Sequence, residues 1–463
     1  MLTKSETPNE ELQPATASQW PQRMGRYRWV VCALLFFATT INYIDRQTLS
    51  LVKEQLDREL GWSNEQFGLV NSAFQLAYAV GLLGFGWFID RFGTKIGYAV
   101  SITAWSIAAM GHGIVGSVRG FVTARLCLGL GEGGNFPAAI KVIALWFPKK
   151  ERAMATALFN SGCNVGSIVA PAVVPILASA YGWRAAFAVA GVAGLVWLLF
   201  WLPFYNVPEK IKNLEPSELL HIRSDKDEPV GGQPDIPWRQ LLRYRQTWSF
   251  VVAKFMTDPV WWFFLIWLPD YFKKTRGLDI KHSWKHIGTI YAIVTVLSIC
   301  GGWLTGALIK RGWSNTRARK TGLLLFAFCA VPILTVTQAG DWMAVMLIGL
   351  AGAAHQAWSA TLYTTVSDVF PKRAIASVIG LGSMAGSIGG AIFPIVTGKL
   401  LDHFESLGHP VGGYRILFGI CGSAYLVAFV FNQLLAPSFA PIGSTEKAAS
   451  LCFWKHDRPT DHN

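Results

Sequence analysis

The chain has 463 residues, of which 52% are hydrophobic and only 15% are charged. A soluble protein of this size needs more charge to cover its surface, so the composition argues against a soluble enzyme or binding module. The net charge of +13 is compatible with binding to nucleic acid or anionic lipid, but the distribution of the positive residues indicates membrane topology instead. No nucleic-acid partner is expected.

Apolar segments long enough to cross a bilayer, about 20 residues each, recur along nearly the whole chain. The first 28 residues are polar and lack the apolar run of a cleavable signal peptide. We therefore expect an all-α polytopic membrane protein that spans the lipid bilayer with twelve transmembrane helices. They are predicted near residues 29–50, 67–89, 98–117, 121–145, 154–178, 185–205, 248–272, 286–309, 321–338, 342–368, 375–402 and 414–436.

The longest polar interruption, residues 206–247, is rich in proline, glycine and mixed charges, and it is predicted to be a linker. It divides the helices into two six-helix bundles, at 29–205 and 248–436, with an N-terminal tail at 1–28 and a C-terminal tail at 437–463. An internal repeat supports this division. F-P-K-K at 147–150 is followed by Pro171, and F-P-K-R at 370–373 is followed by Pro394, with the same spacing in both halves.

The same offset matches Asn160 with Ser383, so the fifth and eleventh helices are predicted to be equivalent elements. Parallel repeats of this kind, with a binding site at the membrane midplane between them, are typical of secondary transporters. Seven cysteines are present without a C-x-x-C pair or clustered histidines. We expect no disulfide framework, no metal site and no cofactor.

Residues 86–95 match the G-x-x-x-D-R-x-G-x-K signature between helices 2 and 3 of the major facilitator superfamily. N-Y-I-D-R at 42–46 and G-E-G at 131–133 resemble the anion:cation symporter family within it. D-P-V-W-W at 258–262 and A-H-Q-A at 354–357 are most similar to bacterial hexuronate transporters. The resemblance implies the major facilitator fold, a small organic anion as substrate and a place in the bacterial inner membrane.

Charged residues inside transmembrane spans are costly and usually functional, which makes Asp45, Arg46, Arg125 and Glu132 the first candidates. Arg46 is predicted to hold a substrate carboxylate, because its guanidinium offers a planar fork of donors; a structural counter-ion to Asp45 or Glu132 is the alternative. Glu132 and Asp45 are predicted to couple transport to protons. Asp45 and Arg125 are both expected in the outer half of the membrane, where they form either a packing pair or a pair that breaks or titrates during the cycle. Arg125 is therefore included among the proton-coupling candidates.

Further polar and aromatic side chains are predicted to bind a sugar, with ordinary interhelical hydrogen bonds as the alternative. The tandem tryptophans Trp261 and Trp262 are predicted to stack against the face of a sugar ring, with anchoring at the membrane interface as the alternative. The predicted set is Tyr43, Tyr78, Asn160, Asn164, Trp261, Thr361, Tyr363, Thr364 and Ser383. In the signature segment, Gly86, Asp90, Arg91 and Gly93 are predicted to act as a conformational gate.

The preferred hypothesis is proton symport of a hexuronate such as glucuronate or galacturonate, by a monomer that needs no chemistry on its substrate. Another organic anion, such as an aldonate or dicarboxylate, and sodium coupling remain open. A membrane enzyme would need a catalytic motif that this sequence does not contain. A sensor without net transport remains a less favoured alternative.

Topology provides the first test. With the predicted spans, 26 of the 41 Lys and Arg residues fall on the side of the tails and the linker, and such residues collect in cytoplasmic loops. Both termini are therefore predicted to be cytoplasmic. With the other six cysteines replaced, an impermeant maleimide should label Cys452 only after cells are opened. Labelling of Cys452 in intact cells would contradict the predicted topology.

Overall fold

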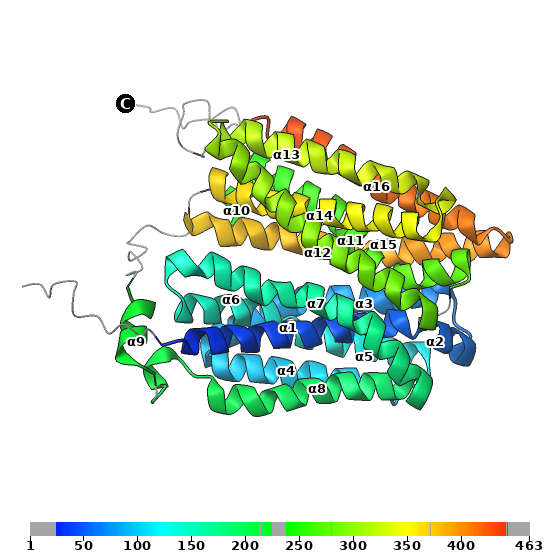
Figure 1. Ribbon diagram of the computed structural model, residues 1–463, viewed down its shortest axis with the longest axis horizontal. Coiled ribbons are helices and arrows are strands. Elements are labelled where there is room, and N and C mark those ends of the chain that lie inside the picture. Colours follow the sequence, from blue (N-terminus) through cyan, green and yellow to red (C-terminus); the bar gives the residue numbers. More distant parts are fainter. Residues whose placement is uncertain are drawn as a thin grey trace, which may run out of the picture.

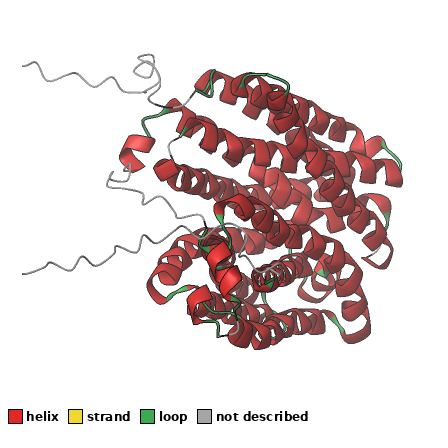
Figure 2. Cartoon of the chain, turned by 60° about the vertical axis from the view of Figure 1, so that its left-hand side comes forward, coloured by secondary structure: helices red, strands yellow, loops and turns green. Residues whose placement is uncertain are grey.

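The computed structural model describes residues 25–212, 214–224, 238–278, 280–370, 372–440 and 442. Helices dominate this part of the chain (Figure 2), as lipid requires, because a helix satisfies its backbone hydrogen bonds internally. Ten helices in the described residues are long and apolar enough to cross a membrane. The remaining predicted spans, 98–117 and 121–145, correspond to α4 and to α5 followed by α6.

The helices form two groups, one from each half of the chain (Figure 1). The N-terminal half contains α1 (Tyr27–Leu51), α2 (Lys53–Leu60), α3 (Asn64–Phe92), α4 (Thr94–Gly111), α5 (Val118–Glu132), α6 (Asn135–Trp146), α7 (Lys149–Tyr181) and α8 (Trp183–Phe204). The C-terminal half contains α11 (Arg245–Arg276), α12 (Ile280–Lys310), α13 (Asn315–Ala330), η2 (Val331–Gln338), α14 (Asp341–Val369), α15 (Lys372–Ser406) and α16 (Pro410–Leu435). The linker contributes η1 (Pro208–Lys210), α9 (Pro216–Ile222) and α10 (Trp238–Leu241).

The start of α1, the linker helix α9 and the end of α16 lie at one end of the molecule, on the left of Figure 1, and α2 lies at the other. We call these the linker end and the distal end. The linker helix is attached to the N-terminal half: Glu218 of α9 accepts hydrogen bonds from the backbone N–H groups of Tyr27 (3.1 Å) and Arg28 (3.0 Å). It also pairs with the Arg28 guanidinium at 3.2 Å. This carboxylate thereby caps the start of α1.

Two predicted spans are interrupted, which corrects the expectation of continuous helices. The span 121–145 breaks at Gly133 and Gly134, between α5 and α6. A Cβ atom on Gly133 would lie 2.3 Å from the backbone of Gly81 in α3, so glycine is needed for this close approach. In the span 321–338, the α-helix ends at Ala330 and a 3₁₀ helix follows from Val331, with Pro332 at its start, because proline cannot supply an N–H to a continuing α-helix.

The two halves touch closely where α3 meets α15. A Cβ atom on Gly68 would lie 2.3 Å from the Pro394 carbonyl oxygen, and one on Gly398 would lie 2.3 Å from the Asn64 carbonyl oxygen. The Ser72 hydroxyl of α3 donates to the Ala391 carbonyl of α15 at 2.5 Å. Small residues thus bring the backbones of the two halves into contact, as membrane helix packing favours.

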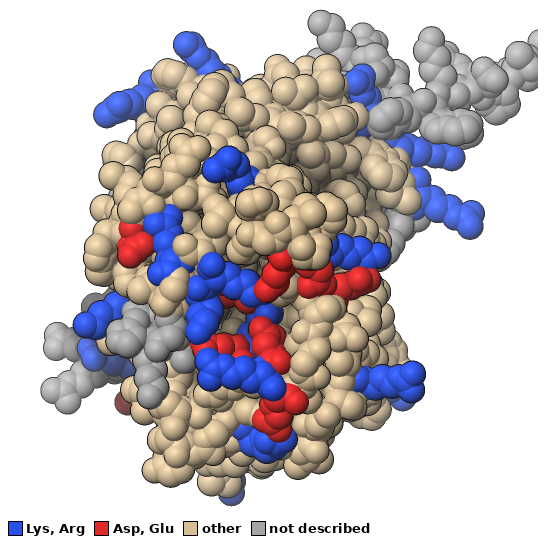
Figure 3. Space-filling view, turned by 90° about the vertical axis from the view of Figure 1, so that its right-hand side faces the viewer, with Lys and Arg blue, Asp and Glu red and all other residues tan. Residues whose placement is uncertain are grey.

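Charged side chains of both signs gather across the middle of the distal end, between the two halves (Figure 3). Lys53, the first residue of α2, contacts Asp270 of α11 at 2.9 Å and Asp57 at 2.7 Å. Tyr414 of α16 donates to Asp270 at 2.5 Å. Burial alone would lower the pKa of Lys53, but the carboxylates of Asp270 and Asp57 outweigh it and raise this pKa. The ammonium therefore stays charged within this network.

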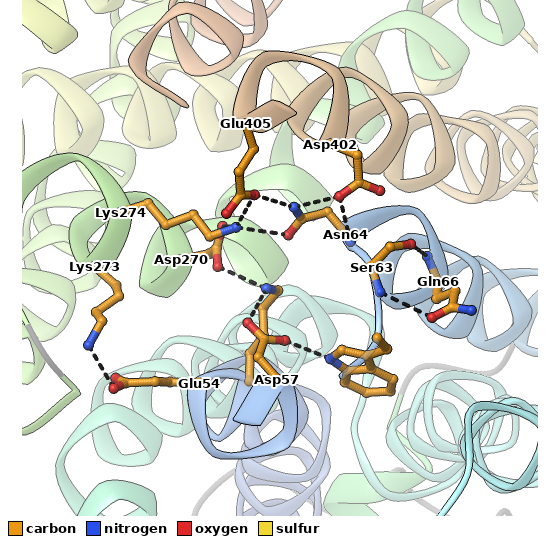
Figure 4. A network of polar contacts seen from close by, with 12 residues as sticks. Glu54, Asp57, Ser63, Asn64, Gln66, Asp270, Lys273, Lys274, Asp402 and Glu405 are labelled. Atoms are coloured by element: carbon orange, nitrogen blue, oxygen red, sulfur yellow. Dashed lines mark hydrogen bonds and ion pairs between the residues drawn. The ribbon is translucent and has the colours of Figure 1, made fainter. Parts of the chain in front are cut away.

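A second group of contacts joins the start of α3 to the end of α15 (Figure 4). Asp402 accepts hydrogen bonds from the backbone N–H groups of Asn64 (2.9 Å) and Glu65 (2.8 Å), so a carboxylate of one half caps a helix of the other. Glu405 contacts the Asn64 amide at 2.9 Å and Lys274 at 2.7 Å. The two halves are therefore held together at the distal end by polar groups.

Candidate functional site

A buried ion pair lies at the centre of the N-terminal half. Arg46, near the distal end of α1, donates through Nε to Oε2 of Glu132 at 2.6 Å. Both side chains are withdrawn from solvent, with exposed fractions of 7% and 0%. Glu132 is the last residue of α5, so the helix break at Gly133 directly follows the carboxylate that the arginine contacts. The end of α5 and the buried ion pair therefore lie at the same place in the structure.

Aromatic rings surround the Arg46 guanidinium. Its central carbon lies 5.0 Å from the ring centroid of Tyr43, 5.4 Å from Phe74 and 4.6 Å from Tyr78. The fourth ring, at 5.5 Å, belongs to Trp262 of α11 and therefore comes from the C-terminal half. Aromatic faces attract a cation more strongly when water is excluded. Arg46 is thus at the interface of the two halves, in contact with both.

Arg125 and Asp45, the other two predicted charges, lie beside the Arg46–Glu132 pair but do not pair with each other. Arg125 donates from Nη2 to the Arg46 carbonyl oxygen at 3.4 Å, and its guanidinium carbon is 5.6 Å from the Phe74 ring. Within the described residues, neither oxygen of the buried Asp45 carboxylate has a hydrogen-bond partner, and Asp45 forms no ion pair with Arg125. Oε1 of Glu132 and the Asn42 amide also have no partner in this part of the chain.

Such buried polar atoms are costly unless a ligand or proton satisfies them. They include both oxygens of Asp45, one oxygen of Glu132 and both amide atoms of Asn42, all close to a cation that faces the opposite half. The arrangement is suited to bind an anion and to take up a proton. It contains no nucleophile paired with a base and so offers no arrangement for covalent catalysis.

The predicted residues of α7 lie on a helix that packs against α1. A Cβ atom on Gly166 of α7 would lie 2.8 Å from Cβ of Tyr43, which shows how closely the two helices approach. Asn160 is exposed and accepts a weak hydrogen bond from the Cys163 thiol at 3.5 Å. Asn164 is half-buried. Both remain candidates for contacts with a substrate.

The predicted residues of the C-terminal half differ in whether their side chains already have partners within that half. Thr361 and Thr364 of α14 donate to carbonyl oxygens of their own helix, at 2.8 and 2.7 Å, and Ser383 of α15 is half-buried. Trp261 stacks on His355 in the core of this half, with ring centroids 5.6 Å apart and an interplanar angle of 9°. It is the neighbouring tryptophan, 262, that reaches Arg46.

Lys254 was absent from the candidate set, although a lysine inside a transmembrane span is itself a signal. It is buried in α11, and its ammonium lies 2.8 Å from Asp258, 3.4 Å from the Ser359 hydroxyl and 4.8 Å from the ring centroid of Tyr363. The predicted residue Tyr363 therefore contacts a cation of its own half. The C-terminal half thus contains a second cation–carboxylate pair.

The signature segment forms the tight connection between α3 and α4. Gly93 has φ of +84° and is both the last cap of α3 and the first cap of α4, a conformation that only glycine adopts without strain. Gly86 is half-buried in α3, and Arg91 is exposed. The side chain of Asp90 lies outside the described part of the chain, so the gating role of this segment remains a prediction.

No group of three or more His, Cys, Asp or Glu side chains able to hold a metal occurs within the described residues. The Glu132 carboxylate instead forms an ion pair with Arg46 of another helix.

Comparison with known proteins supports a transporter. The family model of the Major Facilitator Superfamily matches residues 35–394 and 321–451. The chain is 31% identical to a hexuronate transporter of Escherichia coli (strain K12) over 412 residues, which cover 88% of this chain and 94% of that protein. It is 30% identical to a probable galactarate/D-glucarate transporter of Bacillus subtilis (strain 168), with 81% and 86% covered.

Solved structures show the same fold. A bacterial homologue of the human lysosomal transporter Spinster, in an inward-facing and occupied conformation, aligns with a TM-score of 0.72 at 20% identity, over 90% of this chain and 98% of that one. A D-xylose-proton symporter aligns with a TM-score of 0.71 at 15% identity, over 89% and 99%. The expected family and fold are confirmed: this chain belongs to the Major Facilitator Superfamily and is an integral membrane transporter, not an enzyme.

Proposed function

We propose that this protein imports a sugar acid, specifically a hexuronate such as glucuronate or galacturonate, by proton symport with alternating access. It acts in the bacterial inner membrane, with the linker end in the cytoplasm. The observation that carries the proposal is the Arg46 guanidinium, which is paired with Glu132 and faces a tryptophan of the opposite half. A cation at this interface binds an anion that both halves of the carrier can sense.

Arg46 has donors to spare for a carboxylate. Its Nε nitrogen donates to Glu132 at 2.6 Å, and the guanidinium has four further N–H groups on Nη1 and Nη2. Two parallel N–H groups match the two oxygens of a carboxylate. The phenols of Tyr43 and Tyr78, beside the guanidinium, supply polar edges and flat faces for a sugar ring. The names of the relatives, which include hexuronate and galactarate/D-glucarate transporters, favour the same substrate class.

Coupling to protons follows from the competition for Arg46. A carboxylate in a membrane helix is expensive to keep charged unless a cation is near. When a substrate carboxylate engages Arg46, the cation stabilises ionised Glu132 less, so anion binding favours proton binding. Asp45, whose oxygens have no hydrogen-bond partner within the described residues, is a second acceptor. Release of the substrate returns Arg46 to Glu132 and expels the proton.

Alternating access requires that the contacts at the distal end open. Lys53–Asp270 and Asn64–Asp402 join the two halves there, so this conformation is closed on the side that we assign to the periplasm. Lys53 and Asp270 are buried, with exposed fractions of 4% and 5%, so water must reach these charges as the contact breaks. Opening of the distal end is therefore coupled to hydration of this pair.

Uptake into proteoliposomes tests the proposed cargo and coupling together. Labelled glucuronate and galacturonate should accumulate under an inward proton gradient, and an equal sodium gradient should give no accumulation. Accumulation driven by the sodium gradient alone would show that sodium, and not the proton, is the coupling ion. Uptake of other organic anions, with both hexuronates excluded, would overturn the substrate.

Arg46→Lys should weaken substrate binding at least about tenfold, or about 1.4 kcal/mol, because lysine keeps the charge but lacks the bidentate fork. The measurement is equilibrium binding of labelled hexuronate to purified protein, with thermal unfolding to check that the variant is folded. Arg223→Lys, at an exposed surface pair with Glu209, is the matched control. Near-normal binding by folded Arg46→Lys would remove Arg46 from the substrate site.

Glu132→Gln should retain substrate binding and counterflow exchange, because glutamine imitates the neutral acid, but it should lose proton-driven accumulation. Both activities are measured on the same purified protein. Glu209→Gln, an exposed acid of the linker, is the control and should behave as wild type. Loss of folding, or of both activities, would make Glu132 a structural anchor of α5, and full accumulation by Glu132→Gln would exclude its coupling role.

A further inference from the structure

A second buried cation in the membrane region takes no part in the mechanism above. Lys254 of α11 is 4% exposed, and its ammonium contacts Asp258 one helical turn further along the same helix, at 2.8 Å. A buried ion pair seldom adds stability over well-packed apolar residues, because both charges lose their water. Its presence in an apolar bundle therefore calls for a role.

The surroundings of Lys254 form a built site at the junction of three helices. Ser359 and Tyr363 of α14 supply a hydroxyl at 3.4 Å and an aromatic face at 4.8 Å. Gly386 of α15 leaves room for the acid, since a Cβ atom there would lie 2.1 Å from Oδ2 of Asp258. The ammonium thus has a carboxylate, a hydroxyl and a π face around it.

The Lys254–Asp258 pair lies on the same helix, α11, as the tryptophan that faces Arg46. Trp262, which faces Arg46, follows Lys254 by eight residues, or about 12 Å of helix. The Lys254 side chain extends toward Asp258 and so covers about half of that distance. The helix that brings Trp262 to Arg46 thus also carries the second cation, so each half of the carrier contributes one cation. Each of the two cations is paired with a carboxylate.

We propose that Lys254 is a second carboxylate subsite, which adapts this carrier to sugar diacids as well as to sugar monoacids. This inference rests on the proposed function. One carboxylate of a diacid engages Arg46, and the other displaces Asp258 from Lys254. A monoacid engages Arg46 alone and leaves the Lys254–Asp258 pair intact. The diacid thus bridges the two halves through two charge-assisted contacts.

The test compares galactarate with galacturonate, which share stereochemistry but carry two and one carboxylates. Lys254→Met combined with Asp258→Asn removes both charges together, so no unpaired charge is left buried. The double variant should bind galactarate at least about tenfold more weakly and galacturonate within about twofold of wild type. Lys254→Arg, which keeps a cation, should retain more galactarate binding than the double variant.

Equal weakening of both ligands would make the pair structural, and unchanged galactarate binding would also overturn the subsite. If the wild type takes up galacturonate but does not bind galactarate, the diacid inference fails while the proposed function stands. If the wild type takes up neither, the proposed function itself fails.

A second measurement keeps both charges in place, in case the double variant does not fold. Ser359→Cys, introduced after the seven native cysteines are replaced, puts a thiol at a position whose hydroxyl lies 3.4 Å from the ammonium. Galactarate should protect this cysteine from a small maleimide, and galacturonate should not. Equal protection by both, or by neither, would contradict the assignment.

Discussion

A charge in the hydrocarbon core needs an opposite charge beside it, and the centre of this protein is organised by that requirement. Arg46 and Glu132 come from helices far apart in the sequence, yet their side chains meet at 2.6 Å with almost no exposure. α5 ends at Glu132, and the next residue, Gly133, passes directly against the backbone of Gly81 in α3. The helix end, the close glycine contact and the ion pair are therefore adjacent in the structure.

Contacts between the halves at the distal end differ in their exposure. Lys274–Glu405 is partly exposed, with exposed fractions of 20% and 48%, so water compensates each charge when this contact opens. Lys53–Asp270 is as buried as the Arg46–Glu132 pair, with exposed fractions of 4% and 5%, and its separation without a replacement partner leaves bare charges. We therefore infer that opening of the distal end requires water to reach Lys53 and Asp270.

Much of the fold was predictable from hydropathy and the internal repeat, because the bilayer imposes a fixed length on every spanning segment. The break at Gly133 was missed, since an apolar run says nothing about where a neighbouring backbone passes. The 3₁₀ segment that includes Pro332 had a local signal, the proline itself. The candidate charges of the N-terminal half could be singled out because ionisable residues are rare inside spans; their function stays a prediction.

The sequence indicated which residues are candidates for the site, but not which side chains these residues contact. Helix direction places Asp45 and Arg125 at a similar depth, but rotation about each helix axis decides contact, and Arg125 instead reaches the Arg46 carbonyl. The same limit applies to the adjacent tryptophans, which differ by about 100° around α11: Trp261 points into the core onto His355, and its neighbour points across the interface.

Under the proposed function, Trp262 connects substrate binding with the conformation of the carrier. Three of the rings around Arg46 belong to its own half and move with it, but Trp262 belongs to the other half, 5.5 Å from the guanidinium. Any rocking motion changes this contact, and with it the dielectric environment of the cation. Under the proposed function, the strength with which Arg46 holds either Glu132 or a substrate carboxylate therefore depends on the relative position of the halves. By the reciprocity of coupled equilibria, an anion at Arg46 would in turn shift that position.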